Sequence, residues 1–354
     1  MERFDYTGLP TRVLFGRGRS REIADEIRRL GCRRALVLCT PEQSALAAQV
    51  AGSLGDLAAG VHAHATMHTP VDVTEVALRV FHERGCDVTV AIGGGSTTGL
   101  SKALALRTDA PQLVLPTTYA GSEVTSILGE TQDGRKTTQR SPRVLPEVVI
   151  YDVDLTLTLP LPLTVTSGMN AIAHAVEALY AHDGNPIVSL MAQAGIAAFA
   201  ESLPRIADDP GDIAARSRAQ YGAWLCGTCL AMTSMGLHHK LCHVLGGTFD
   251  LPHAPTHTVI LPHAVAYNAQ AAPEAMQRIA KALGADDAAG GLFALSTRLR
   301  APRSLREIGM PADGLDRAAT LATSDAYANP RPLERDSLRA MLGRAFEGAA
   351  PMAG

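Results

Sequence analysis

The chain has 354 residues, of which 46% are hydrophobic and 19% are charged, and its formal net charge is −3. This length predicts about two domains with well-formed cores, and the composition is that of a soluble globular enzyme. The small net charge excludes the basic surface of proteins that bind nucleic acid or anionic membranes, and no apolar run reaches the ~20 residues that span a bilayer. The N-terminus lacks a signal-peptide pattern and the six cysteines are expected to be reduced thiols, so we expect a cytoplasmic protein.

Strands and helices alternate through the first third of the chain. Residues 34–40 (RALVLCT) form a continuous apolar run, as in a parallel strand that is buried on both faces. Expected strands cover residues 11–16, 34–40, 60–65, 86–95 and 111–118, and expected helices cover 20–30, 43–54, 74–84 and 97–106. This alternation predicts an α/β domain with a doubly wound, Rossmann-like parallel sheet.

A glycine-rich turn, Gly93-Gly94-Gly95-Ser96, lies between one of these strands and the next helix. Consecutive glycines let the backbone approach a pyrophosphate, and a helix N-terminus offers free N–H groups to it. The turn is not G-x-G-x-x-G, so taken alone a tight structural turn explains it equally well. Lys102, further along the helix, is a candidate contact to an anion or ribose.

Cofactor choice is expected to be set at Cys39-Thr40, at the end of the first buried strand. An Asp there would repel a 2′-phosphate, and the sequence has none, so we expect NADH, NADPH or both as cofactor.

A proline-rich stretch, residues 146–162, marks the predicted boundary between domains 1–158 and 159–354. Beyond it, apolar residues recur at helical period, which predicts an all-α second domain. The expected helices are 167–181, 186–202, 212–231, 236–245, 273–284, 287–300, 302–308, 313–322 and 335–346.

Two of these helical segments carry polar residues on one face at helical spacing. Asn170, His174 and Glu177 (or Ala178) share a face of the helix that Ser167 is expected to cap. His239 and His243 lie one turn apart on another helix, which we expect Gly246 and Gly247 to end.

His253 follows on a loop bounded by prolines. Asn170, His174, His239 and His253 form a convergent set that would bind Zn²⁺ or Fe²⁺ if position 170 were a carboxylate. Because Asn170 is a neutral amide, we expect a vestigial metal site without a metal.

The segments GMNAIAHAVEALYA, LHHKLCHVLGG, LPHAPTH, LPHAVAYN, AIGGGSTTGLSKALAL and LPTTYAGSEVT resemble the iron-containing (group III) alcohol dehydrogenase family over nearly the whole chain. The resemblance implies that family's fold, which dehydroquinate synthase shares. It also implies a pyrophosphate contact at the glycine turn and cofactor contacts at Thr117, Thr118 and Tyr119. This chain has Gly99 where the family often has Asp.

Within the family, Asn170, PRVLPEVVIYD and the late YANPRPL resemble the maleylacetate reductases. The resemblance implies reduction of the carbon–carbon double bond of maleylacetate to give 3-oxoadipate, in the degradation of aromatic compounds.

The reaction needs donors at the developing enolate oxygen, cations for two carboxylates, and an acid. We therefore expect His243, His253 and Tyr327 to be catalytic, with His243 nearest the nicotinamide. Asn170, His174, His239 and Arg331 are expected to bind the dianionic substrate, and His182, His238, His257 and His263 are expected to be structural.

Two alternatives stay open. A metal-dependent alcohol dehydrogenase could tolerate Asn170, and a non-redox relative such as a sugar-phosphate cyclase would need basic residues that grip a phosphate. The resemblance also implies a homodimer, with residues 1–16 as the pairing edge.

Overall fold

The structure, a computed structural model, describes residues 3–352 except the side chain of Lys136. It divides into a sheet unit, Thr7–Leu159, and a helical unit made of residues 3–6 and 160–352. The predicted domains, 1–158 and 159–354, differ from these units in residue 159 and in the residues that precede the first strand. The fold class predicted from the sequence is confirmed.

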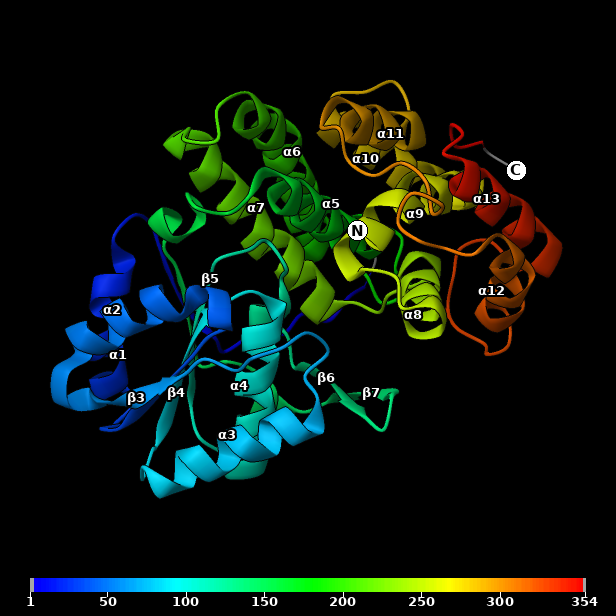
Figure 1. Cartoon of the computed structure of the whole chain (residues 1–354). Coiled ribbons are helices and arrows are strands. Elements are labelled where there is room, and N and C mark those ends of the chain that lie inside the picture. Colours follow the sequence, from blue (N-terminus) through cyan, green and yellow to red (C-terminus); the bar gives the residue numbers. More distant parts are fainter. Residues whose placement is uncertain (1–2, 353–354) are drawn as a thin grey trace. The chain divides into compact units, whose positions relative to one another are not determined.

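The sheet unit contains a six-stranded parallel sheet with the order β1-β8-β5-β4-β2-β3 (Figure 1). Its strands are β1 (Arg12–Phe15), β2 (Ala35–Leu38), β3 (Ala58–His62), β4 (Val88–Gly93), β5 (Gln112–Pro116) and β8 (Val148–Tyr151). Its helices are α1 (Ile23–Arg29), α2 (Ser44–Leu54), α3 (Val71–Glu83) and α4 (Gly95–Thr108). A separate antiparallel hairpin, β6 (Ile127–Gln132) and β7 (Arg135–Arg140), completes the unit.

Helices cover both faces of the sheet, as its continuous apolar strands require. Val37 of β2 belongs to a core that includes residues of α1 and α2, whereas the neighbouring Leu36 packs with α3 and α4 on the other face. Successive strand residues point to opposite faces, so each strand contributes to both cores.

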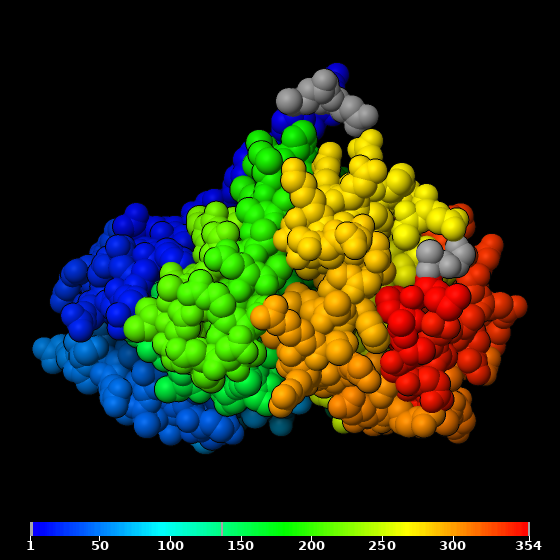
Figure 2. All heavy atoms as spheres, turned by 90° about the horizontal axis from the view of Figure 1, so that it is seen from above, coloured from blue at the N-terminus to red at the C-terminus, as the bar shows by residue number. Residues whose placement is uncertain are grey.

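The helical unit consists of nine described α-helices. They are α5 (Leu161–Leu179), α6 (Pro186–Asp208), α7 (Ile213–Met232), α8 (Leu237–Phe249), α9 (His253–Asn268), α10 (Pro273–Leu283), α11 (Ala288–Arg298), α12 (Leu315–Ala322) and α13 (Arg335–Glu347). Side-chain caps start several of them: the Asn185 side chain, for example, accepts hydrogen bonds from the backbone N–H groups of Ile187 and Val188. Figure 2 shows the green residues of α6 and α7 beside the orange residues of α10 and α11.

Several predicted boundaries are wrong. The α8 helix continues through Gly246 and Gly247 and ends at Phe249, and the next residue, Asp250, adopts the left-handed conformation expected of a glycine. Ser167 lies inside α5, where its hydroxyl donates to the backbone oxygen of Leu163. His253 does not lie on a loop but begins α9, because Pro255 falls in the first turn, where a helix tolerates proline.

Residues 302–308 form turns rather than the expected helix, and the β6–β7 hairpin was not expected.

Helix α6 is, among the described helices, the one long and apolar enough for a membrane span, with a mean hydropathy of 1.3 in its most apolar window. No such segment was expected from the sequence. Buried core helices of soluble proteins meet the same criterion. Phe199, Leu203 and Ile206 of α6 are buried, and the helix packs against α5, α7 and α10.

Candidate active site

The glycine-rich turn joins the end of β4 at Gly93 to the start of α4 at Gly95. A Cβ at Gly93 would lie 2.3 Å from Oγ1 of Thr97, and one at Gly94 would lie 2.8 Å from Oγ1 of Thr118. Gly95 is exposed, and a Cβ there would meet no described atom within 4 Å. The turn therefore leaves open space at the N-terminus of α4, where free N–H groups favour a phosphate. Ser96, next in the chain, is half-buried in the same turn.

The carboxyl ends of β2, β4 and β5 meet at this edge of the sheet. The backbone N–H of Thr117 donates to the oxygen of Gly93 (3.1 Å), and Nε2 of Gln43 donates to Oγ1 of Thr117 (2.8 Å). Gln43 was not singled out from the sequence, although a polar residue soon after a buried strand was an available signal. Tyr119 is fully buried near the same strand end.

Cys39 does not offer its side chain to this edge. It is fully buried in the core beneath α1 and α2, and this burial raises the pKa of its thiol. A cofactor contact at Cys39 is therefore restricted to its backbone.

The loop before α3 has a strained backbone at Thr69 and approaches α4. Thr69 has a φ of 45°, which is rare for a β-branched residue, and its side chain is buried. A Cβ at Gly99 would lie 2.3 Å from Oγ1 of Thr69, so the Thr69 hydroxyl occupies the space beside Gly99. Positive φ at a non-glycine residue is not readable from sequence, and Thr69 was missed.

In the helical unit, α5, α8 and α9 bring a cluster of histidines together. The ring centroids of His174 and His239 are 5.1 Å apart, and those of His239 and His243 are 6.5 Å apart. His253 contacts the cluster through His257, whose ring lies 4.3 Å from that of His253 and 4.9 Å from that of His239. His257, expected to be structural, therefore occupies the middle of the cluster.

Part of the cluster is buried with unused polar atoms. Oδ1 of Asn170, Nδ1 of His174 and Nε2 of His239 have no hydrogen-bond partner among residues 3–352. Burial holds the pKa of His174 well below its usual range, so this imidazole is neutral. His243 and His253, in contrast, are exposed. Buried polar atoms without partners mark positions where a ligand's polar groups or water are needed.

The set Asn170, His174, His239 and His253 does not fit a divalent iron or zinc ion. It offers three imidazoles and an amide oxygen, with no carboxylate or thiolate to offset the charge of the ion, and an amide oxygen is not among the usual ligands of zinc or iron. Within the described part of the chain, the one group of potential ligands with all its atoms within 4.8 Å is His238, Cys242 and His257.

The trio of His238, Cys242 and His257 is also explained by hydrogen bonds. Nε2 of His238 lies 3.0 Å from Nδ1 of His257 and 3.7 Å from Sγ of Cys242. Burial lowers the pKa of His238 and His257 and raises that of the Cys242 thiol, so all three side chains are neutral.

Tyr327 and Arg331 lie on the segment after α12. Tyr327 is half-buried beneath Nζ of Lys240, 5.7 Å from its ring centroid, and its hydroxyl lacks a partner among the described residues. The guanidinium of Arg331 stacks 4.2 Å from the ring centroid of Tyr267 and donates to the backbone oxygen of Tyr267. The Arg331 side chain therefore interacts with α9, and no described contact joins it to the histidine cluster.

Comparison with known proteins gives matches over the whole chain. Residues 10–153 match the family model "Iron-containing alcohol dehydrogenase", and residues 164–346 match "Fe-containing alcohol dehydrogenase family, C-terminal". A maleylacetate reductase of Rhizobium sp. (strain MTP-10005) is 56% identical, over 99% of this chain and 100% of the relative.

Solved structures of members of the same family resemble the structure of this chain. The maleylacetate reductase of Agrobacterium tumefaciens has a TM-score of 0.96 at 56% identity and covers 99% of this chain and 100% of its own. An iron-containing alcohol dehydrogenase of Corynebacterium glutamicum has a TM-score of 0.93 at 40% identity, with coverage of 98% and 97%.

Proposed function

The chain belongs to the iron-containing alcohol dehydrogenase family of oxidoreductases, and we propose that it is a maleylacetate reductase that works without a metal. In this proposal it reduces the carbon–carbon double bond of maleylacetate to give 3-oxoadipate, during the degradation of aromatic compounds. Curated maleylacetate reductases at 50–56% identity support this assignment. The single observation that carries the metal-free part is Asn170, a neutral amide beside buried histidines.

The side chains of Asn170, His174 and His239 suit hydrogen bonds to a substrate better than coordination of a metal cation. The substrate is a dianion, and negative charge develops on its ketone oxygen as the double bond is reduced. A carboxylate at position 170 would repel that charge, whereas the Asn170 amide and the His174 and His239 imidazoles can hydrogen-bond to it. Nδ1 of His174 and Nε2 of His239, which are buried without partners among residues 3–352, support this role. The Oδ1 of Asn170 only accepts hydrogen bonds, so the donor of this side chain is its amide nitrogen.

The open turn at Gly93–Gly95 fits the pyrophosphate of NADH or NADPH. Ser96, Thr117 and Thr118 line the same edge and are proposed to hold the cofactor, together with Tyr119. When bound, the nicotinamide supplies the hydride. The chain then has to supply a proton for the adjacent carbon, and His243, His253 and Tyr327 are the candidates.

We also propose a cytoplasmic homodimer that pairs through β1. This strand is the edge of the sheet and is hydrogen-bonded to β8 on one side. Its second edge is available for pairing, although residues 1 and 2 of the predicted pairing segment lie outside the described chain. Light scattering coupled to size-exclusion chromatography tests this, and a monomer would remove the claim.

The function is tested by following NADH and NADPH oxidation with maleylacetate, with and without EDTA, beside metal analysis of the purified protein. Turnover that survives the chelator in metal-free protein supports the proposal. Activity that needs added Fe²⁺ or Zn²⁺ and appears on simple alcohols or aldehydes would refute it in favour of a metal-dependent alcohol dehydrogenase.

A further inference from the structure

Glu177 is a fully buried carboxylate in the last turn of α5, and it faces the beginning of α8. Its Oε1 accepts from the backbone N–H of His238 (2.9 Å), and its Oε2 accepts from that of Gly236 (3.1 Å). The side chain of His239 approaches still closer, with Nδ1 lying 2.6 Å from Oε2. No Lys or Arg of the described chain forms an ion pair with Glu177, so backbone N–H groups and His239 solvate its charge.

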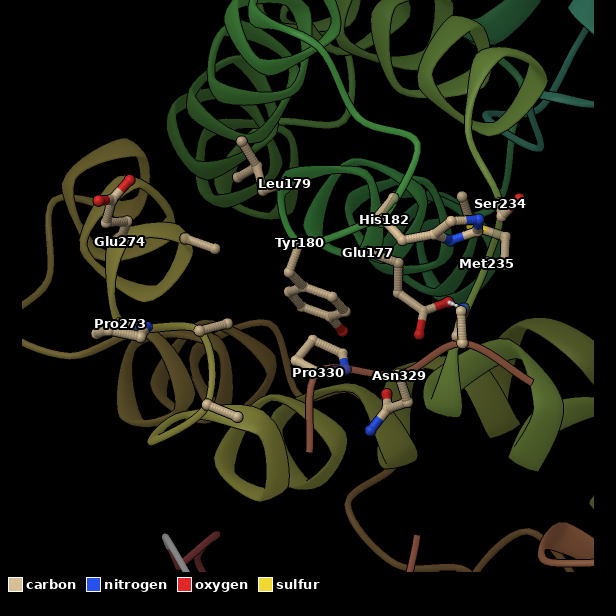
Figure 3. Close-up of a pocket in the computed structure, with 16 residues that line it drawn as sticks. Glu177, Leu179, Tyr180, His182, Ser234, Met235, Pro273, Glu274, Asn329 and Pro330 are labelled. Carbon is tan, nitrogen blue, oxygen red and sulfur yellow. Dashed lines mark hydrogen bonds between the residues drawn. The ribbon is translucent and has the colours of Figure 1, made fainter. Parts of the chain in front are cut away.

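The other side of Glu177 lines a pocket of about 460 Å³ inside the helical unit. Figure 3 shows the Glu177 side chain extending between Tyr180 and the segment that carries Ser234 and Met235. A Cβ at Gly236 would lie 3.2 Å from Oε1 of Glu177, so the missing side chain at Gly236 lets the carboxylate approach the start of α8. The Glu177 carboxylate is thus held between α5, which carries it, and the start of α8.

The geometry determines which nitrogen of His239 carries a proton. A carboxylate only accepts hydrogen bonds, so the Nδ1 of His239 must donate. Nε2 is then the nitrogen that remains for a ligand, and it is the buried atom of His239 that has no partner within residues 3–352. The His239 ring lies 5.1 Å from that of His174, so the two imidazoles are neighbours in the cluster.

We propose that Glu177 is a positioning residue, which fixes the tautomer and orientation of His239 so that Nε2 is presented to the substrate. The proposal rests on the proposed function, because it takes His239 as a substrate contact. A carboxylate can orient a functional histidine without touching the substrate. Where the oriented histidine binds a metal, loss of the carboxylate typically costs about 10- to 100-fold in activity, and we expect an effect of that size here.

The competing interpretation is that Glu177 only caps α8. Three of its contacts, from the backbone N–H groups at the start of α8, are compatible with that role, since the first turn of a helix has free N–H groups. A pure cap would affect stability and leave the kinetics of the folded enzyme unchanged, so kinetics and spectroscopy separate the two roles.

The first experiment compares Glu177→Gln with Glu274→Gln, an exposed carboxylate that lines the same pocket. In folded Glu177→Gln we expect kcat with maleylacetate to fall about 10- to 100-fold while KM changes less than about threefold. Glu177→Asp, which keeps the charge, should recover part of the loss, and Glu274→Gln should match the wild type. A folded Glu177→Gln enzyme with kcat within about twofold of wild type would overturn the proposal.

The second experiment is independent of activity. In protein labelled with ¹⁵N-histidine, the His239 Nδ1 proton should give a strongly downfield resonance, assigned by its loss in His239→Gln and absent in Glu177→Gln. A wild-type spectrum with His239 protonated at Nε2 alone overturns the proposal even if no Glu177 variant folds. If the enzyme proves inactive on maleylacetate, the proposed function fails, while the spectrum still decides whether Glu177 fixes His239.

Discussion

The ammonium group of Lys102 lies 2.7 Å from the backbone oxygen of Thr125. It also donates to Oγ1 of Thr125 (2.9 Å) and to the backbone oxygen of Ile127 (2.9 Å). All three N–H bonds of this fully buried side chain are therefore used to join α4 to the start of β6. Burial lowers the pKa of Lys102 to about 7. Lys102 therefore has no free N–H group for the cofactor contact that the sequence suggested.

Replacing Lys102 by Met should therefore lower stability rather than cofactor affinity. Three oxygens lose the Lys102 donor, and a buried acceptor left without a partner typically costs about 1–3 kcal/mol in the free energy of unfolding. Urea denaturation measures this cost, with the exposed Lys281→Met as the control. A tenfold rise in KM for NADH at unchanged stability would instead restore the role of Lys102 as an anion contact.

The glycine turn offers a matched pair of substitutions. Gly95→Ala places a methyl group in the open space at the start of α4, so we expect KM for NADH to rise about tenfold, or ~1.4 kcal/mol, with stability unchanged. Gly93→Ala would collide with Oγ1 of Thr97 at 2.3 Å and with Oε1 of Gln43 at 2.7 Å, so it should lower the midpoint of thermal unfolding. An unchanged KM for Gly95→Ala would show that no phosphate approaches this turn.

Asn170→Asp should restore the missing charged ligand. We expect the variant to bind Fe²⁺ or Zn²⁺, detected by titration calorimetry and metal analysis, because a carboxylate joins the imidazoles. Its turnover of maleylacetate should fall about tenfold or more, because the new negative charge faces a dianion. Asn170→Ser, which stays neutral, is the control and should bind no metal; equal metal binding by wild type would contradict the metal-free proposal.

The buried pair His238 and His257 is tested by a double-mutant cycle. His257→Leu leaves Nε2 of His238 without its 3.0 Å partner, so it should cost about 1–3 kcal/mol in the free energy of unfolding. The double substitution with His238→Leu should cost less than the sum of the two single changes, because no orphaned nitrogen remains. If the trio with Cys242 held a metal instead, EDTA would lower the unfolding midpoint of wild type, and we expect no such shift.

Acid should destabilise the helical unit through His263. Burial, with a smaller effect of Arg344, lowers the pKa of this fully enclosed imidazole from 6.5 to about 4. Between these values the unfolded chain binds a proton that the folded chain does not, so stability is lost as pH falls from 6.5 towards 4, by about 3 kcal/mol. Denaturation at several pH values measures the slope, which His263→Leu should make shallower without removing it, because three other buried histidines also have lowered pKa values. An unchanged slope would mean that other groups dominate.

The sequence alone determined the fold class and much of the candidate site. Continuous apolar strands alternating with helices, as at residues 34–40, are compatible with few architectures other than a doubly wound sheet. The helical spacing of His239 and His243 also placed both side chains on one face, because i, i+4 geometry is local. The amide at position 170 likewise defined the chemistry of the set without any structure.

Local rules failed where tertiary contacts decide. Gly246 and Gly247 stay helical because Leu245 and Leu251 on either side are buried in the unit's core, which outweighs their low propensity. The β6–β7 hairpin pairs polar strands that have no apolar alternation to detect.

Only the tertiary structure decided what surrounds the site residues. It placed His257 inside the cluster and directed the Cys39 thiol into the core. It also paired all three N–H groups of Lys102 with oxygens of Thr125 and Ile127. It also brought Glu177 within 2.6 Å of His239, a residue 62 positions away in the chain. Sequence spacing fixes which side chains share a helix face, whereas contacts between helices depend on packing that spacing does not encode.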